Sequence, residues 1–130
     1  MVVLDENIRD SQADFLRKRG IACRKIGTDL SAKGTSDANI IPLLLRLKHP
    51  AFFTQDADFW DVRLCHSGYC LAYLDVKPRD AAGYIRRFLR HSLFDTAGGR
   101  LGKVVHIHKD GITYYAAGSR KTHVVSWTNR

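Results

Sequence analysis

Short apolar runs alternate with amphipathic segments along most of the chain. Apolar runs that predict strands lie at residues 2–4, 21–26, 51–54 and 69–76. Apolar side chains at 3.6-residue spacing predict helices at residues 8–19, 36–47 and 78–94. Continuous apolar runs are typical of parallel strands that are buried on both faces. The pattern therefore predicts an α/β fold with a mainly parallel sheet.

Turn and cap residues mark the ends of several of these elements. Gly20 stands where the first helix is expected to end, and Thr35 or Ser36 is placed to cap the second. Pro42 lies inside the second helix and predicts either a kink or a late start. In the last helix, the 3.6-residue spacing predicts a core face made of Ala82, Ile85, Leu89 and Leu93.

The pattern changes after the last predicted helix. Gly98-Gly99 is expected to break the chain. The segments 103–108 and 112–116 flank Asp110-Gly111, which is a strong hairpin signal. Residues 123–127 predict one more strand. We expect this antiparallel addition to follow the parallel sheet.

Length and composition indicate one domain. The chain has 130 residues, of which 45% are hydrophobic, and this is enough for one core. We expect a single domain over 1–130, with its core at about 1–97 and a hairpin extension at about 98–130. No apolar run reaches the ~20 residues of a membrane span, and the N-terminus lacks signal-peptide features. The expectation is a cytoplasmic protein without a membrane partner.

The positive charge is concentrated in the second half of the chain. The net charge is +8, and residues 1–76 hold ten basic and ten acidic side chains, whereas residues 77–130 hold eleven and three. Such a basic half is typical of proteins that bind a phosphate backbone. The predicted nucleic-acid-binding residues are Arg86, Arg87, Arg90 and Lys103. A solvated helix face is the alternative for the arginines.

Acidic side chains follow two of the predicted strands and open two helices. Asp5 and Glu6 follow the first strand, and Asp56 follows the third. Asp37 and Asp58 stand at the starts of helices, where a negative charge is also favoured for local reasons. The carboxyl ends of neighbouring parallel strands meet at one edge of a sheet, where ligands bind.

Carboxylates that meet at one point repel each other unless a cation lies between them. Oxygen ligands favour Mg²⁺ or Mn²⁺ over zinc. We therefore predict a metal site formed by Asp5, Glu6, Asp37, Asp56 and Asp58. A metal-bound water would be the nucleophile of a phosphodiester hydrolysis, and a second ion about 4 Å away would stabilise the leaving oxygen. A turn or helix-cap role is the alternative for the individual acids.

The three cysteines match no common disulfide or zinc spacing. Cys23, Cys65 and Cys70 are predicted to be small buried side chains. A metal site formed by Cys65, His66 and Cys70 is the alternative.

Histidines and aromatic residues are concentrated in the predicted hairpin region. His106 and His108 share a strand face and predict a surface pair, with a metal pair as the alternative. Tyr114, Tyr115 and Trp127 are expected to pack in the sheet. Base stacking is the alternative for these three rings.

The acidic stretches resemble motifs of the PIN-like superfamily. A small branch of that superfamily has a Leu-Asp-Glu-Asn start, then Ser-Asp, then Thr-x-Asp-x-Asp-Phe. This sequence has the three motifs at residues 4–7, 36–37 and 54–59, and the likeness covers about residues 2–76. Many members resemble the toxins of toxin–antitoxin pairs and are similar to VapC-type toxins.

The resemblance implies a three-layer α/β/α sandwich and a Mg²⁺- or Mn²⁺-dependent endoribonuclease. It implies cleavage of RNA to a 3′-hydroxyl and a 5′-phosphate, an antitoxin partner that covers the active-site groove, and a homodimer by analogy. The catalytic acids implied are Asp5, Asp37, Asp56 and Asp58. Pro42, the lead-in at 48–50 and the segment from Gly98 depart from the family pattern.

Two other functions are compatible with the same residues. One is a non-catalytic PIN-like module that binds RNA or an antitoxin. The other is a phosphoacceptor receiver domain, which Asp5-Glu6, Asp56 and Lys77-Pro78 imitate. The receiver interpretation lacks one βα unit between Asp56 and Lys77.

Overall fold

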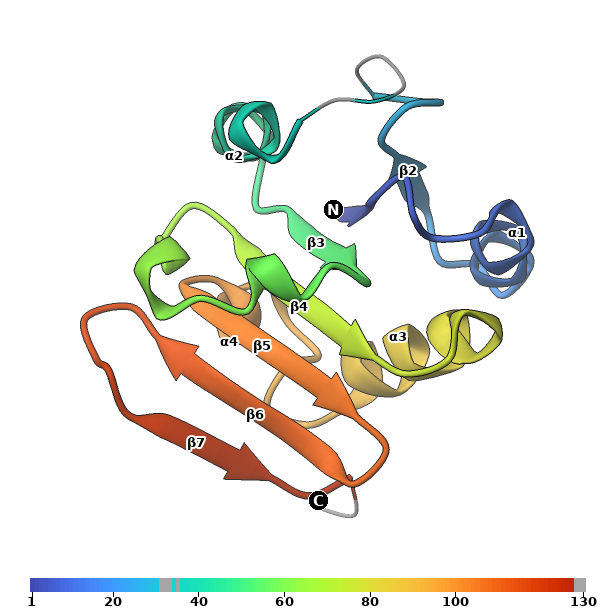
Figure 1. The fold of residues 1–130 in the computed structure, drawn as a ribbon. Coiled ribbons are helices and arrows are strands. Elements are labelled where there is room, and N and C mark those ends of the chain that lie inside the picture. Colours follow the sequence, from blue (N-terminus) through green and yellow to red (C-terminus); the bar gives the residue numbers. More distant parts are fainter. Residues whose placement is uncertain (31–33, 35, 128–130) are drawn as a thin grey trace.

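The computed structural model describes residues 1–30, 34 and 36–127, with Asp37 described by its backbone alone (Figure 1). Seven strands form one sheet in the order β2-β1-β3-β4-β5-β6-β7. Their bounds are β1 Val2–Leu4, β2 Cys23–Lys25, β3 Ala51–Thr54, β4 Cys70–Asp75, β5 Lys103–His108, β6 Gly111–Ala116 and β7 Thr122–Val125.

The strands β2, β1, β3, β4 and β5 pair in parallel, and β6 and β7 continue the sheet antiparallel. The predicted α/β fold, with a mainly parallel sheet and antiparallel C-terminal strands, is confirmed. β1 pairs with β2 on one side and with β3 on the other, so the chain reverses its direction of winding there. β5 completes the parallel part of the sheet, so the segment after residue 98 belongs to the sheet itself.

The helical elements connect these strands. They are α1 Asp10–Lys18, α2 Asp37–Arg46, the short 3₁₀ turns η1 Ala57–Phe59, η2 Val62–Leu64 and η3 Pro78–Asp80, then α3 Ala81–Arg90 and α4 Ala97–Arg100. Gly20 ends the first helix as predicted, with φ of 79°. The N–H groups of Gly20 and Ile21 donate to the carbonyls of Arg17 and Leu16, which is the Schellman arrangement.

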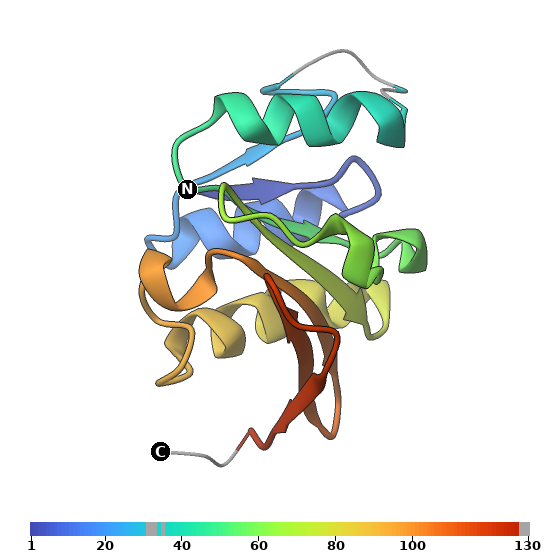
Figure 2. The ribbon, with the colours of Figure 1, turned by 90° about the vertical axis from the view of Figure 1, so that its left-hand side faces the viewer.

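Alternate side chains of the strands pack into two separate clusters, one on each face of the sheet. Figure 2 shows α2 and α3 on opposite sides of the central strands. On what we term the α1/α3 face, strand residues pack with residues of α1 and α3. The strand residues are Leu4, Phe53, Ala72 and Val105, and the helix residues are Leu16 and Ile85. On the opposite face, termed the α2 face, the corresponding residues are Val3, Phe52, Leu71 and Val104 against Ile40 and Leu44. The alternation follows from the two-residue repeat of a strand.

The last predicted helix was placed wrongly in two respects. Helix α3 ends at Arg90, because His91 adopts an extended backbone and the chain turns there. Phe88 is fully buried and stacks on Phe94, whereas Leu93 is 44% exposed. Ala82 and Ile85 are buried as predicted, but in the last turn of the helix Phe88 is fully buried and Leu89 only partly.

Three local expectations also differ from the structure. Gly98-Gly99 lies inside α4, where Thr96 Oγ1 accepts a hydrogen bond from the Gly99 N–H and caps the helix. Helix α2 begins at Asp37, so Pro42 causes no late start. The hairpin is confirmed, but Gly111 pairs with His108, so its two turn residues are Lys109 and Asp110.

Among the described residues, no helix has the length and apolar character needed to cross a membrane.

Candidate active site

Two acids follow the neighbouring strands between which the winding of the sheet reverses. Asp5 directly follows β1, and Asp56 follows β3 by two residues. The Asp5 N–H donates to the carbonyl of Phe53 at 2.9 Å, so the two strand ends stay paired. Strand alternation directs Asp5 and Thr54 to the α2 face. In open α/β sheets, this switch point at the carboxyl ends of the strands is the usual ligand site.

Asp5 is held by three hydrogen-bond donors. Its Oδ2 accepts from Thr54 Oγ1 at 2.6 Å and from Asn7 Nδ2 at 3.3 Å, and its Oδ1 accepts from the Glu6 N–H at 2.7 Å. Asp5 is 7% exposed and Thr54 is fully buried. Thr54 Oγ1 also accepts from the Asp56 N–H at 3.0 Å. One hydroxyl group therefore connects the two acidic strand ends.

The surroundings of Asp5 disfavour its negative charge. Burial raises the pKa of Asp5 above its ordinary value, and the hydrogen bonds from Thr54 and Glu6 partly oppose this rise. The negative charges of Asp56 and Glu6 raise this pKa further. The Asp5 carboxylate therefore lies within the electrostatic range of Asp56, and a cation between the two would relieve their repulsion.

Asp56 caps a 3₁₀ turn. Its Oδ1 accepts from the Asp58 N–H at 2.9 Å at the start of η1. Asp58 itself is exposed. The local cap role considered for Asp58 therefore belongs to Asp56.

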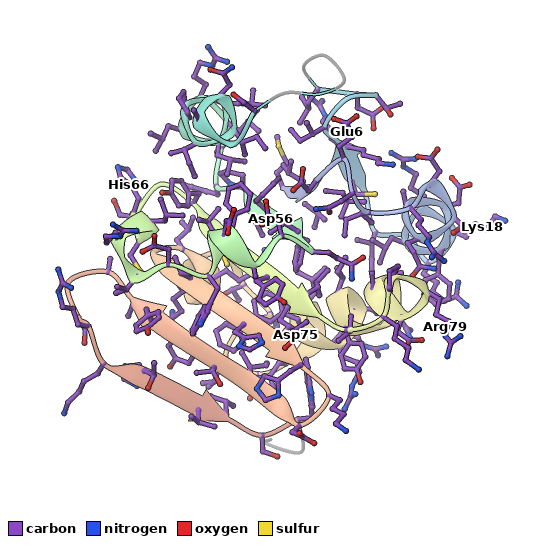
Figure 3. The ribbon with its side chains drawn as sticks, in the orientation of Figure 1. Glu6, Lys18, Asp56, His66, Asp75 and Arg79 are labelled. Atoms are coloured by element: carbon purple, nitrogen blue, oxygen red, sulfur yellow. The ribbon has the colours of Figure 1, made fainter. Side chains whose placement is uncertain are left out.

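Glu6 points toward the loop after β2. Its Oε1 accepts from the Gly34 N–H at 2.8 Å, and its side chain packs against Gly27. Figure 3 shows Glu6 well apart from Asp56. The side chain of Asp37 lies outside the described part of the structure, so the prediction that it joins the site stays a prediction.

Within the described residues, no group of three or more His, Cys, Asp or Glu side chains is arranged to hold a metal ion. The carboxylates of Asp5 and Asp56 are the oxygen donors described at the ends of β1 and β3, and they interact electrostatically. This pair fits Mg²⁺, which in proteins is commonly held by one or two carboxylates, with waters and substrate phosphates completing its shell.

The alternative metal sites have other partners. Cys65 Sγ donates to the Tyr115 carbonyl and His66 Nδ1 accepts from the Gly68 N–H, while burial raises the pKa of Cys70 to about 12. His106 and His108 lie with ring centroids 5.0 Å apart. They bond to different side chains, Asp75 and Thr113 respectively.

Sequence reasoning missed the residues that position the acids. Thr54 and Asn7 stand inside the quoted motifs, but neither was assigned a role. Asn7 also accepts from the Gln55 N–H at 3.2 Å, which ties the ends of β1 and β3 together a second time. Asp75, which ends β4, pairs with His106 at 3.0 Å. Its place at a parallel strand end was the signal that could have found it.

The predicted nucleic-acid-binding residues lie on the α1/α3 face. Arg86, Arg87 and Arg90 line a pocket of about 350 Å³ with Phe15 and Trp127. Lys103 donates to the Gly99 carbonyl and faces the rings of Phe94 and Tyr114. These four basic residues are therefore on the other side of the sheet from Asp5.

The chain is an α/β protein whose mainly parallel sheet reverses its winding between β1 and β3, and Asp5 and Asp56 follow these two strands. No protein-family model matches the chain, and no curated protein or solved structure matches it significantly.

Proposed function

We propose that this chain is a Mg²⁺- or Mn²⁺-dependent endoribonuclease with the three-layer α/β/α sandwich of PIN-like proteins. In this proposal it acts in the cytoplasm as the toxin of a toxin–antitoxin pair. The observation that carries the proposal is the position of Asp5 and Asp56 after the neighbouring parallel strands β1 and β3, at the switch point of the sheet. A buried carboxylate whose pKa is raised is a candidate for function.

The hydrogen bonds around Asp5 support a reactive role rather than a packing role. Thr54 and Asn7 fix the carboxylate from two strand ends, so it needs little rearrangement to bind a ligand. A packing role would be served as well by an apolar side chain, without the cost of burying a charge. The presence of the Asp5 carboxyl group at this buried position therefore points to a positively charged ligand.

A bound Mg²⁺ or Mn²⁺ would polarise the phosphoryl oxygen and lower the pKa of a bound water. Asp5 and Asp56 would hold this ion. Asp37 and Asp58 are proposed as further acids of the site, on the strength of the resemblance. Glu6 is given no such role, because it is bonded to the Gly34 N–H.

The test compares two aspartates in matched positions. Asp56 and Asp61 each cap a 3₁₀ turn, and asparagine can cap in the same way. Asp56→Asn should reduce Mg²⁺-dependent cleavage of end-labelled RNA at least about a hundredfold, because a charge at the metal site is lost. Asp61→Asn should leave cleavage unchanged. Robust cleavage by Asp56→Asn, or by the unaltered protein in excess chelator, would refute the proposal.

A non-catalytic module that binds RNA or an antitoxin is the second candidate. The observation that favours it is that the described acids do not form a group of three metal ligands. It predicts salt-sensitive RNA binding without turnover. It also predicts that Asp56→Asn leaves the calorimetric titration with Mg²⁺ unchanged.

The receiver interpretation is weakened by the connection from β3 to β4. This connection contains η1 and η2 and no α-helix. Phosphorylation of Asp56 by a small phosphodonor would restore that interpretation.

A further inference from the structure

The α2 face carries a group of aromatic rings over the C-terminal half of the sheet. Figure 1 looks onto this face across β4 to β7, with α3 and α4 behind the sheet. In the described chain, η1 and η2 lie over β4, and no helix covers β5, β6 and β7 on this side. The rings, which we term the ring face, are Trp60, Tyr73, His106 and Tyr115.

The rings contact one another across three strands. Trp60 lies 4.8 Å from Tyr115 and 5.4 Å from His106, measured between ring centroids. Tyr73 stacks on His106 at 5.1 Å. All four residues are partly exposed. They form a continuous group of ring contacts that solvent partly reaches.

The ring face continues directly into the acidic pair. Tyr73 is the register partner of Thr54, and both side chains point to the α2 face. Thr54 bonds to Asp5 and to the Asp56 N–H. Tyr73 therefore lies on the strand next to Thr54, whose hydroxyl group bonds to Asp5.

Basic side chains lie at both ends of the ring face. Lys77 and Lys109 line a pocket at the end of β4 together with Asp75 and Asp80. Arg120 lines another of about 240 Å³ at the opposite end, near the β6–β7 turn, with Arg63, which is paired with Asp61. Asp75 is paired with His106. This arrangement complements a polyanion more closely than an apolar protein surface.

We propose that the ring face binds single-stranded RNA by base stacking and guides it to Asp5 and Asp56. This rests on the proposed function for its substrate. Aromatic side chains on an open sheet face stack unpaired bases, and flanking cations hold the phosphates. Bases inside a duplex are not available for such stacking, so the chemistry selects single strands.

The binding test uses the chain's own fluorophore. The two tryptophans lie on different faces, since Trp127 packs under Arg87 beside α3. Trp127→Phe leaves Trp60 as the reporter. Titration of this variant with an eight-nucleotide single-stranded RNA in excess chelator should quench Trp60 fluorescence, and a matched RNA duplex should not. Chelator prevents metal-dependent cleavage, so binding is measured apart from catalysis.

Neighbouring residues of β7 supply a matched pair of variants. Val124 is 77% exposed on the α2 face, and His123 stacks on Tyr114 on the other face. Val124→Glu should weaken RNA binding at least about threefold, because its charge repels phosphate. His123→Glu should change binding much less. Tyr115→Ala should weaken it about tenfold or more, through loss of a stacked base.

The outcomes separate this inference from the proposed function. Trp60 quenching that Val124→Glu weakens supports the ring face, even where no cleavage is found. Absence of quenching, equal binding of duplex RNA, or equal effects of Val124→Glu and His123→Glu would overturn it. Binding of a protein instead of RNA by this face would also overturn it.

Discussion

The Thr54 hydroxyl group links the acidic ends of β1 and β3. It donates to Asp5 and accepts from the Asp56 N–H, and it is fully buried. A buried hydroxyl with both roles satisfied gives the carboxylate one preferred orientation. The same hydrogen bond lowers the pKa of Asp5, against the larger effect of burial.

Replacing Thr54 by valine should raise the pKa of Asp5 further. Valine keeps the shape of the side chain but removes the donor that stabilises the carboxylate. The measurement is an NMR titration of the Asp5 carboxyl carbon. Thr113→Val, which alters a hydroxyl beside His108, is the control and should leave this pKa unchanged. An unchanged pKa in Thr54→Val would contradict the hydrogen-bond account.

The raised pKa of Asp5 also fixes the sign of a stability change with pH. The folded state binds this proton more tightly than the unfolded state, whose value is near 3.8. The contribution of Asp5 to the free energy of unfolding therefore declines as pH rises from that value through its folded pKa. Urea denaturation across this window should show a larger decline in Thr54→Val than in the unaltered protein.

At the scale of elements, two glycines differ in backbone conformation: Gly20 follows α1, and Gly83 lies inside α3. Gly20 follows α1 with φ of 79°, a conformation that side chains disfavour, whereas Gly83 lies inside α3. Nothing lies within 4 Å of a Cβ atom at either position, so packing does not distinguish them. The difference is one of backbone conformation.

The same substitution should therefore change stability in opposite directions. Gly20→Ala should lower the free energy of unfolding by about 1 kcal/mol, and Gly83→Ala should raise it by about 0.5–1 kcal/mol. Urea denaturation of both variants measures this. Equal signs would show that the α1 terminus is not in the left-handed conformation.

At the scale of the molecule, the two faces of the sheet carry different kinds of side chain. The α1/α3 face carries the arginines of α3, and the α2 face carries the acidic pair and the ring face. The net charge of +8 favours the binding of any polyanion. Under the proposed function, only a strand bound on the face that carries Asp5 could react.

The two faces can be compared directly. The double variant Arg86→Glu and Arg87→Glu removes more positive charge than Val124→Glu, yet it should weaken binding of single-stranded RNA less, because it lies on the far face. The readout is the Trp60 titration in the Trp127→Phe background at two salt concentrations. A larger effect of the double variant would place RNA on α3, as the sequence pattern alone predicted.

Much of the fold could be predicted from local signals. Continuous apolar runs predicted β1 and β3, and Gly20 predicted the end of α1, because both signals depend on nearby residues. The end of α3 could not be predicted in this way. His91 turns the chain and Phe94 packs back on Phe88, and that contact depends on the sheet beneath.

The acids of the site show the same division. The sequence by itself determined that Asp5 and Asp56 follow the ends of predicted strands, since strand ends follow from the apolar pattern. The tertiary structure decided that these two strands are neighbours in the sheet. Only the tertiary structure decided that Glu6 turns to Gly34, that Thr54 joins the acids, and that the arginines of α3 lie on the far face. Side-chain direction depends on which face of the sheet each residue meets, and that is fixed when the strands pair.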